Sequence, residues 1–241
     1  MNQKTSTILL VLALAVGAWL IYSRPNPDST ALRIRELAAR GLAEEIARTQ
    51  SAGQVLVLSN PFVNQPGVRR DIVEVETAGI TGLRTGLGTK LILGPVVPPE
   101  LLPAAKDNPW TLLEGNDSTT PISFLMTPDA IDKLVKKHAD SGVIVSLVGL
   151  PAELDRCEAW KIPGAPRFAF LLPDFRGIAD RAAIVEAFKS GKLIAAVLPK
   201  PSAPGNAGKL SGDLDAEFES RFILLTPHNA ERVLEQMPAL F

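Results

Sequence analysis

Hydrophobic residues along this chain gather in short continuous runs that end in turn-forming residues. The first run of the body is Val55–Leu58, which lies between Gly53 and the polar turn Ser59-Asn60-Pro61. An aliphatic run of this length, closed on both sides by turn residues, is typical of a strand buried on both faces of a parallel sheet. Further strands are predicted for the similar runs Lys90–Leu93, Ile122–Met126, Val143–Val148, Phe168–Leu172, Leu193–Leu198 and Phe222–Leu225.

Segments with helical spacing separate these runs. In the first of them an apolar residue recurs every three or four positions from Ile34 to Ile46. This spacing predicts a helix that begins near Ser29 or Thr30 and ends before Gly53. Further helices are predicted near Arg69–Leu83, Asp129–His138, Ala152–Trp160, Arg181–Lys189 and Asn229–Gln236.

The alternation of strand and helix predicts the fold class. It indicates a single soluble α/β domain over residues 30–241, with a mostly parallel sheet covered by helices on both faces, as in a Rossmann-like three-layer fold. Two segments rich in proline and polar residues do not fit the alternation and are expected to be long loops. These segments are Pro95–Thr120 and Pro199–Gly212.

A long uncharged segment precedes the domain. The 19 residues between Lys4 and Arg24 carry no charge, and Ile8–Tyr22 is strongly apolar. A helix of that length is about 28 Å long, which matches the hydrocarbon core of a bilayer. Residues 1–24 are therefore predicted to be a single-pass transmembrane signal anchor with lipid as its partner, followed by a proline-containing linker at residues 25–29. A signal peptide cleaved after Ala13-Leu14-Ala15 is the alternative.

The orientation of this anchor decides where the domain lies. The span resembles a signal anchor whose amino end stays inside, so the domain is predicted to be extracytoplasmic, on the periplasmic side. The arginines at positions 24, 33, 35 and 40 follow the span, and by the positive-inside rule they favour the cytoplasm instead.

One short sequence pattern occurs three times. Met126-Thr127-Pro128 corresponds to Leu225-Thr226-Pro227, and Leu58-Ser59-Asn60-Pro61 is a looser copy. In each copy a polar side chain can cap the next helix, and proline suits the first helical turn. One interpretation is ordinary turn chemistry; the other is that the free amide groups of several helices meet at one sheet edge and bind a polar or anionic ligand. The candidate ligand-binding residues are Ser59, Asn60, Thr127, Asp129, Asp174, Thr226, His228 and Asn229.

Composition narrows the classes of function. The 25 basic and 26 acidic residues are interspersed, so nucleic acid is not expected as a partner. The single cysteine, Cys157, excludes an intrachain disulfide and a thiolate metal cluster, and the sequence contains no motif for a metal or a cofactor. Of the two histidines, only His228 lies at the predicted ligand edge, where it could act in proton transfer.

The succession of buried strands, each followed by a polar turn and a helix, resembles the Rossmann-type lobes of periplasmic solute-binding proteins. The segment from Arg35–Leu42 into Val55–Pro61 is also similar to uncharacterised membrane-anchored bacterial proteins. This resemblance implies a Rossmann-like fold and a role in binding a solute. The body is shorter than a two-lobed binding protein with a hinge.

Three hypotheses for function remain open. The first is a membrane-anchored, non-catalytic domain that binds a small polar or anionic solute. The second is a structural or assembly protein that presents an interaction surface to a membrane protein partner. The third is an enzyme of unknown reaction that uses His228 as acid or base.

Overall fold

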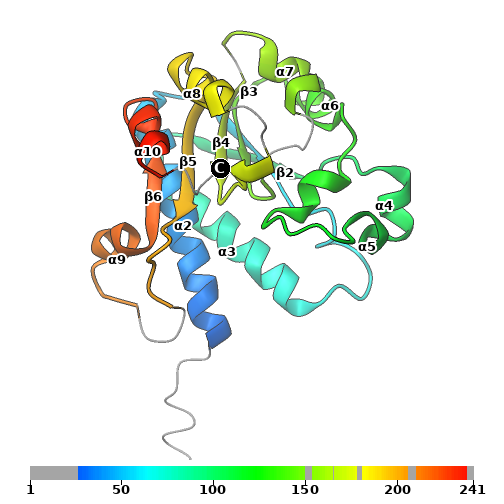
Figure 1. Ribbon diagram of the computed structural model, residues 1–241, viewed down its shortest axis with the longest axis horizontal. Helices are drawn as coiled ribbons and strands as arrows, with labels where there is room; N and C mark the ends of the chain where they lie inside the picture. The colour runs from blue at the N-terminus through cyan, green and yellow to red at the C-terminus, as the bar shows by residue number, and fades with distance from the viewer. Residues whose placement is uncertain (1–26, 150–153, 165, 178–180, 206–209, 238–241) are drawn as a thin grey trace, which may run out of the picture.

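The computed structural model describes residues 27–149, 154–164, 166–177, 181–205 and 210–237 (Figure 1). The predicted membrane helix, residues 1–24, lies outside the described residues. Within the described ranges no helix is both long and apolar enough to cross a bilayer. The first helix of the described residues, α2, begins at Pro27 and therefore includes the last three residues of the segment predicted as a linker.

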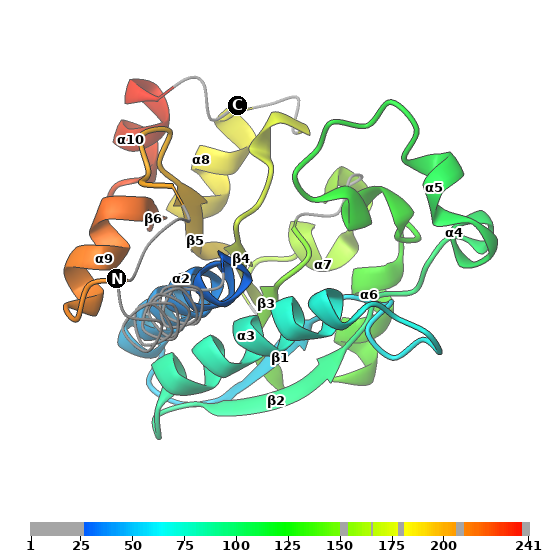
Figure 2. The same cartoon turned by 90° about the horizontal axis from the view of Figure 1, so that it is seen from below.

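A six-stranded sheet forms the centre of the domain (Figures 1 and 2). Its strands lie in the order β2-β1-β3-β4-β5-β6, and neighbouring strands are parallel except for β6, which is antiparallel to β5. The prediction of a mostly parallel sheet is thus confirmed. The strands are β1 (Gln54–Leu58), β2 (Ile92–Val97), β3 (Ser141–Ser146), β4 (Arg167–Leu171), β5 (Leu193–Pro199) and β6 (Phe222–Leu225).

Helices connect the strands and cover the sheet. The α-helices are α2 (Pro27–Thr49), α3 (Arg70–Leu87), α4 (Pro103–Asp107), α5 (Pro109–Leu112), α6 (Ala130–Lys137), α7 (Glu158–Lys161), α8 (Arg181–Lys189), α9 (Leu214–Arg221) and α10 (Ala230–Gln236). The short 3₁₀ helices in the described ranges are η1 (Pro121–Leu125), η2 (Leu154–Arg156) and η3 (Phe175–Gly177).

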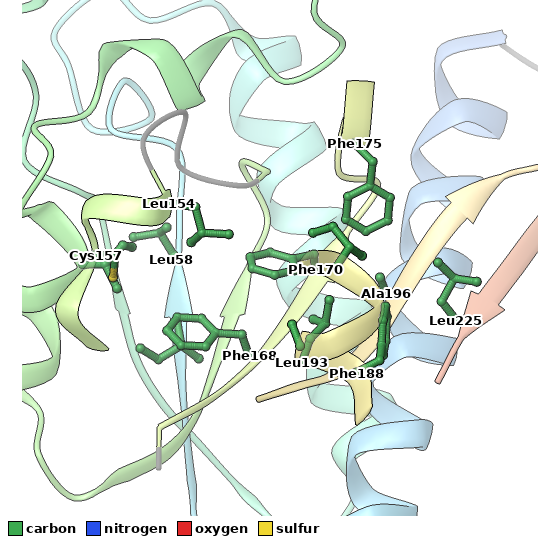
Figure 3. Packing of buried hydrophobic residues seen from close by; sticks show 14 of the residues in the cluster. Leu58, Leu154, Cys157, Phe168, Phe170, Phe175, Phe188, Leu193, Ala196 and Leu225 are labelled. Atoms are coloured by element: carbon green, nitrogen blue, oxygen red, sulfur yellow. The ribbon is translucent and has the colours of Figure 1, made fainter. Parts of the chain in front are cut away.

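Alternate strand residues fill a separate hydrophobic core on each face of the sheet. On one face, Leu58 of β1 and Phe168 and Phe170 of β4 belong to one core with Phe188 of α8 (Figure 3), and this core also includes residues of α6, α7 and α10. On the other face, Val55 and Val57 of β1 pack beneath α2 and α3. Because successive side chains of a strand point to opposite faces, an aliphatic run of this kind needs cover on both sides. The predicted three-layer arrangement is confirmed.

Helices α2 and α3 pack against each other with their backbones in close contact. A Cβ atom at Gly82 would overlap the backbone oxygen of Glu36, and one at Gly86 would overlap that of Arg40. These glycines therefore lie inside α3 and allow the close approach, whereas Gly88, with φ of 58°, ends the helix.

Two predicted elements are wrong. The run Ile122–Met126 is not a strand, because Pro121 begins the 3₁₀ helix η1 there, and Leu125 packs in a small separate cluster with Leu101 and Ala105. The segment Pro95–Thr120 is not a continuous loop either, since it contains the end of β2 and the short helices α4 and α5.

The helix α9 was not among the predicted elements. Its carboxylates alternate in the sequence as they would along an extended chain, but Asp213 caps the helix by accepting from the amide groups of Asp215 and Ala216. A cap of this kind satisfies amide groups that the first helical turn leaves free.

Candidate functional site

A cleft lies at the carboxyl edge of the parallel strands. Its volume is about 520 Å³, and the residues that follow β1, β3, β4 and β5 form its floor. The amino-terminal parts of α2 and α3 form one wall, because each of these helices runs back from the carboxyl edge of the sheet. Ligands of open α/β sheets bind at this edge.

Most of the cleft is apolar, with a polar corner on one side. The apolar lining residues include Ile34, Val75, Ile122, Leu147, Val148, Leu172, Leu198 and Phe222. The polar corner consists of Arg35 on α2, Asn60 after β1 and Glu76 on α3. A few polar groups on an apolar lining are typical of small-molecule sites.

The Arg35 guanidinium is held in place by two backbone carbonyl groups. Its Nε donates to the oxygen of Val75 at 3.0 Å, and its Nη2 donates to the oxygen of Leu147 at 3.1 Å. Burial lowers the pKa of Arg35, and the charge of Glu76 opposes that shift. Nη1 of Arg35 has no hydrogen-bond acceptor among the described residues, so this group remains available to a ligand.

Glu76 is buried beside Arg35. One carboxylate oxygen, Oε1, accepts from the amide of Asn60 at 3.0 Å. Burial raises the pKa of Glu76, while the hydrogen bond from Asn60 and the charge of Arg35 oppose the shift. No hydrogen bond or ion pair joins the side chains of Arg35 and Glu76, both of which the structure describes.

A second wall of the cleft is fastened by Asp174, in the turn after β4. Its carboxylate accepts from the hydroxyl of Ser118 at 2.9 Å, from the amide of Thr119 at 3.0 Å and from Arg176 through both the amide and the guanidinium. The Arg176 guanidinium, with these amide and hydroxyl donors, holds the pKa of Asp174 well below its usual range. Asp174 therefore fixes the loop that carries Thr119 and Thr120 over the cleft.

A third wall is fastened by a buried ion pair on α9. Nε of Arg221 donates to Glu217 at 2.6 Å, and its Nη1 donates to the carbonyl oxygen of Pro204 at 2.8 Å. The second oxygen of Glu217 accepts from the amide of Ser211, and this bond together with Arg221 lowers the pKa of Glu217. The loop after β5 is thus joined to α9 at two positions, Pro204 and Ser211.

The structure brings only two of the eight predicted site residues into this cleft. Asn60 and Asp174 line it. Ser59 is buried at the end of β1, where its amide donates to the oxygen of Val97. Thr127 and Asp129 lie ahead of α6 and outside the lining, where the Thr127 amide donates to the oxygen of Glu100.

The remaining three predicted residues lie at the opposite edge of the sheet. Strand β6 is antiparallel to β5, so the turn that follows it leaves from the amino edge of the parallel strands. There Oδ1 of Asn229 accepts from the amide of Thr226 at 2.8 Å, and the exposed His228 lies between them in the sequence. The three copies of the sequence pattern therefore do not meet at one edge.

Two residues of the polar corner were missed by the sequence reasoning. Arg35 shares a helix face with Ala38, Ala39 and Leu42, which are all buried. Glu76 likewise lies three and seven positions before Gly79 and Leu83 on the buried face of α3. The available signal was a charged residue on an otherwise apolar helix face, which is uncommon unless the charge has a partner or a function.

Comparisons with known proteins give only distant structural similarity. No protein-family model matches the chain, and no curated protein matches it. The chain is similar to an ABC transporter solute-binding protein from Burkholderia graminis in complex with D-arabinose, with a TM-score of 0.45 and 13% identity over 81% of this chain and 60% of that chain.

Two further similar structures belong to the same class. A sugar-binding protein of a sugar ABC transporter from Bacillus halodurans has a TM-score of 0.46 and 12% identity over 82% of this chain and 64% of that chain. A periplasmic solute-binding protein from Actinobacillus succinogenes with bound D-allose has a TM-score of 0.43 and 10% identity over 82% of this chain and 62% of that chain. The chain thus spans less than two thirds of the length of each. The resemblance to solute-binding proteins drawn from the sequence is confirmed to this extent.

Proposed function

We propose that this chain is a binding domain for a small polar or anionic solute, which it holds in the carboxyl-edge cleft. The observation that supports this most directly is the Arg35 guanidinium, which two carbonyl groups fix at the cleft while Nη1 has no acceptor among the described residues. A donor that is already oriented loses little side-chain freedom when a ligand binds. A hydrogen bond to a charged group contributes about 1.5–3 kcal/mol.

A panel of small polar and anionic solutes tests this proposal by thermal unfolding of the full chain. A solute that binds the folded state raises the unfolding temperature in a saturable way. Because Arg35→Met also removes two bonds to carbonyl groups, the quantity to compare is the solute-dependent shift within each variant. We expect Arg35→Met to lose that shift and Arg33→Met, an exposed arginine on the same helix outside the cleft, to keep it. A shift that survives in Arg35→Met contradicts the assignment of the cleft.

The membrane tether is also part of the proposal. The apolar segment Ile8–Tyr22 supports a single-pass anchor, and its resemblance to a signal anchor whose amino end stays inside supports an extracytoplasmic domain. Extraction of membranes at alkaline pH distinguishes an integral anchor, which stays in the pellet, from a cleaved leader, which leaves the domain in solution. Protease protection in spheroplasts then reports the side on which the domain lies.

A second candidate function is that of an assembly protein, and one exposed apolar group favours it. Trp110 on α5 is 77% exposed. Leu112 on the same helix and Phe124 on η1, which contacts α5, are also exposed. Large exposed aromatic residues are enriched where proteins contact partners. Crosslinking in native membranes from a photoreactive residue at position 110 tests this candidate; a single stoichiometric membrane protein in the product would support it.

A further inference from the structure

The polar corner of the cleft carries two opposite charges that do not neutralise each other directly. The guanidinium of Arg35 contacts the carbonyl oxygen of Val75, the residue immediately before Glu76. The Arg35 guanidinium, which comes from α2, therefore lies against the turn of α3 that carries Glu76, and each charge affects the pKa of the other. No hydrogen bond or ion pair joins these two described side chains.

Each charged group also has hydrogen-bonding capacity that the described chain does not use. Glu76 engages Oε1 with the amide of Asn60, and Asn60 engages its own Oδ1 with the amide of Phe62. This leaves Oε2 of Glu76 and Nδ2 of Asn60 without a partner among the described residues, as well as Nη1 of Arg35. The corner thus offers donors for an anionic group and, next to them, an acceptor for an amine.

Apolar side chains line the cleft next to the polar corner. Ile34 and Val75, the sequence neighbours of Arg35 and Glu76, line the cleft with Leu147 and Leu172. Leu172 has a positive φ of 51°, which is uncommon for a residue other than glycine, and its amide is fixed by the carbonyl oxygen of Val197 at 2.9 Å. Leucine occupies a backbone conformation that glycine usually adopts, and its side chain adds apolar surface to the cleft that Arg35 and Glu76 also line.

We propose that the ligand of this cleft is a zwitterion with an apolar body: its anionic group binds Arg35 and Asn60, its amine binds Glu76, and its body contacts the apolar lining. A free apolar amino acid and an ethanolamine phosphate head group both carry this pair of charges. The inference rests on the proposed function and names the ligand class of the same site. A ligand of one charge only would displace water and leave either Nη1 of Arg35 or Oε2 of Glu76 without a hydrogen-bond partner, which is unfavourable in a buried site.

Matched ligands test each charge separately by titration calorimetry on the full chain. L-Leucine carries both charges, 4-methylpentanoate lacks the amine, and 3-methylbutylamine lacks the carboxylate. We expect L-leucine to bind at least tenfold more tightly than either analogue, since each charged hydrogen bond corresponds to a factor of about ten or more in affinity. O-phosphoethanolamine is the second arm: tighter binding of this compound than of L-leucine indicates a head group as the source, and the reverse indicates a free amino acid.

Charge-specific variants separate recognition from loss of folding. Glu76→Gln keeps an oxygen that can accept from Asn60, so it should weaken the binding of L-leucine and 3-methylbutylamine but not that of 4-methylpentanoate. Arg35→Met should weaken L-leucine and 4-methylpentanoate but not the amine. General destabilisation cannot produce these opposite selectivities. Glu74→Gln and Arg33→Met, on the same two helices outside the cleft, should bind as the unmodified chain does.

The results that overturn this inference differ from those that overturn the proposed function. Equal binding of L-leucine and one of its analogues, or binding of a neutral solute alone, overturns the zwitterion while the cleft remains a binding site. Binding of either zwitterion that does not respond to Glu76→Gln also overturns it. Absence of any solute whose binding depends on Arg35 overturns both proposals.

Discussion

At the scale of single residues, Asp174 has the densest set of hydrogen bonds around the cleft. Replacing it with asparagine removes the charge and leaves some of its donors without an acceptor. We expect Asp174→Asn to lower the free energy of unfolding by about 1–3 kcal/mol at pH 7. The share of Arg176 in this loss is small, because its side chain is 46% exposed and solvent screens the ion pair. Chemical denaturation at pH 7 measures the difference.

The pH dependence of that difference identifies its cause. The pKa of Asp174 is held below its usual range in the folded state, so its contribution is complete above the unfolded pKa of about 3.9 and is lost as the pH falls through the folded pKa. The gap between the two proteins should therefore be constant near neutral pH and shrink below about pH 4. Asp117→Asn is the control, since Asp117 is 97% exposed and should show no gap. A difference in unfolding free energy that does not change with pH would mean that the substitution acts through altered hydrogen-bond geometry and not through the lost charge.

The candidate site could be predicted only in part from single residues. Polar residues directly after a buried parallel strand are readable from the sequence, and Asn60 and Asp174 do line the cleft. The sequence of a strand does not show whether it runs parallel or antiparallel to its neighbour. Thr226 was therefore expected at the carboxyl edge of the sheet, although β6 is antiparallel to β5. Arg35 and Glu76 come from helix faces, and only the packing of α2 on α3 brings them together.

At the scale of elements, the contact between α2 and α3 depends on glycine at particular positions of α3. Gly82→Ala would place a Cβ against the backbone of Glu36, which cannot move without shifting α2. We expect this variant to lose about 1–3 kcal/mol of unfolding free energy through overpacking, despite a gain in helix propensity of up to about 1 kcal/mol. Thermal and urea unfolding followed by circular dichroism measure the change.

Gly79→Ala is the matched control on the same helix. A Cβ there would lie 3.3 Å from Cδ1 of Leu147, a terminal methyl group that needs to shift by only a few tenths of an ångström, and 3.5 Å from Nε of Arg35, which is ordinary van der Waals contact. This variant gains the same helix propensity without a clash with backbone, so its stability should be unchanged or higher. Equal losses in both variants would show that the close contact of the two helices is not what requires Gly82.

The predicted elements succeeded where local pattern and tertiary burial agree. The helix α8 has the predicted bounds, Arg181–Lys189, and the aliphatic strand runs β1 and β3–β6 all lie in the sheet. The prediction for Ile122–Met126 failed because an apolar run of five residues can be buried without being a strand. Leu125 packs in a small cluster beside the sheet, whereas Ile122 and Met126 pack against the larger core from a 3₁₀ helix and the residue that follows it. Helix α9 was not predicted because its acidic residues occur at every second position, as on an extended chain. Its buried residues, Glu217 and Arg221, are both charged, so no apolar helical pattern marks it.

At the scale of the whole molecule, the start of the described chain and the cleft lie at the same edge. Helix α2 runs from Pro27 at the carboxyl edge of the sheet toward the amino edge, and Arg35 lines the cleft after about 12 Å of helix. The five peptide links from Tyr22 to Pro27 span at most about 18 Å. If Ile8–Tyr22 crosses the bilayer, Arg35 lies within about 30 Å of its surface, and we expect the carboxyl edge, where the tether attaches, to lie nearer the membrane than the amino edge.

Energy transfer to a lipid-bound acceptor measures this orientation in nanodiscs. A donor dye at Asp117→Cys reports the carboxyl edge, since Asp117 lies beside Arg176, and a donor at Asp140→Cys reports the amino edge, immediately before β3. The native Cys157 can remain, because it is buried and burial raises the pKa of its thiol to about 11, which leaves little thiolate to react. We expect the higher transfer efficiency from position 117. Equal efficiencies would mean that the body rotates freely on its tether, and the reverse order would mean that the cleft opens away from the membrane.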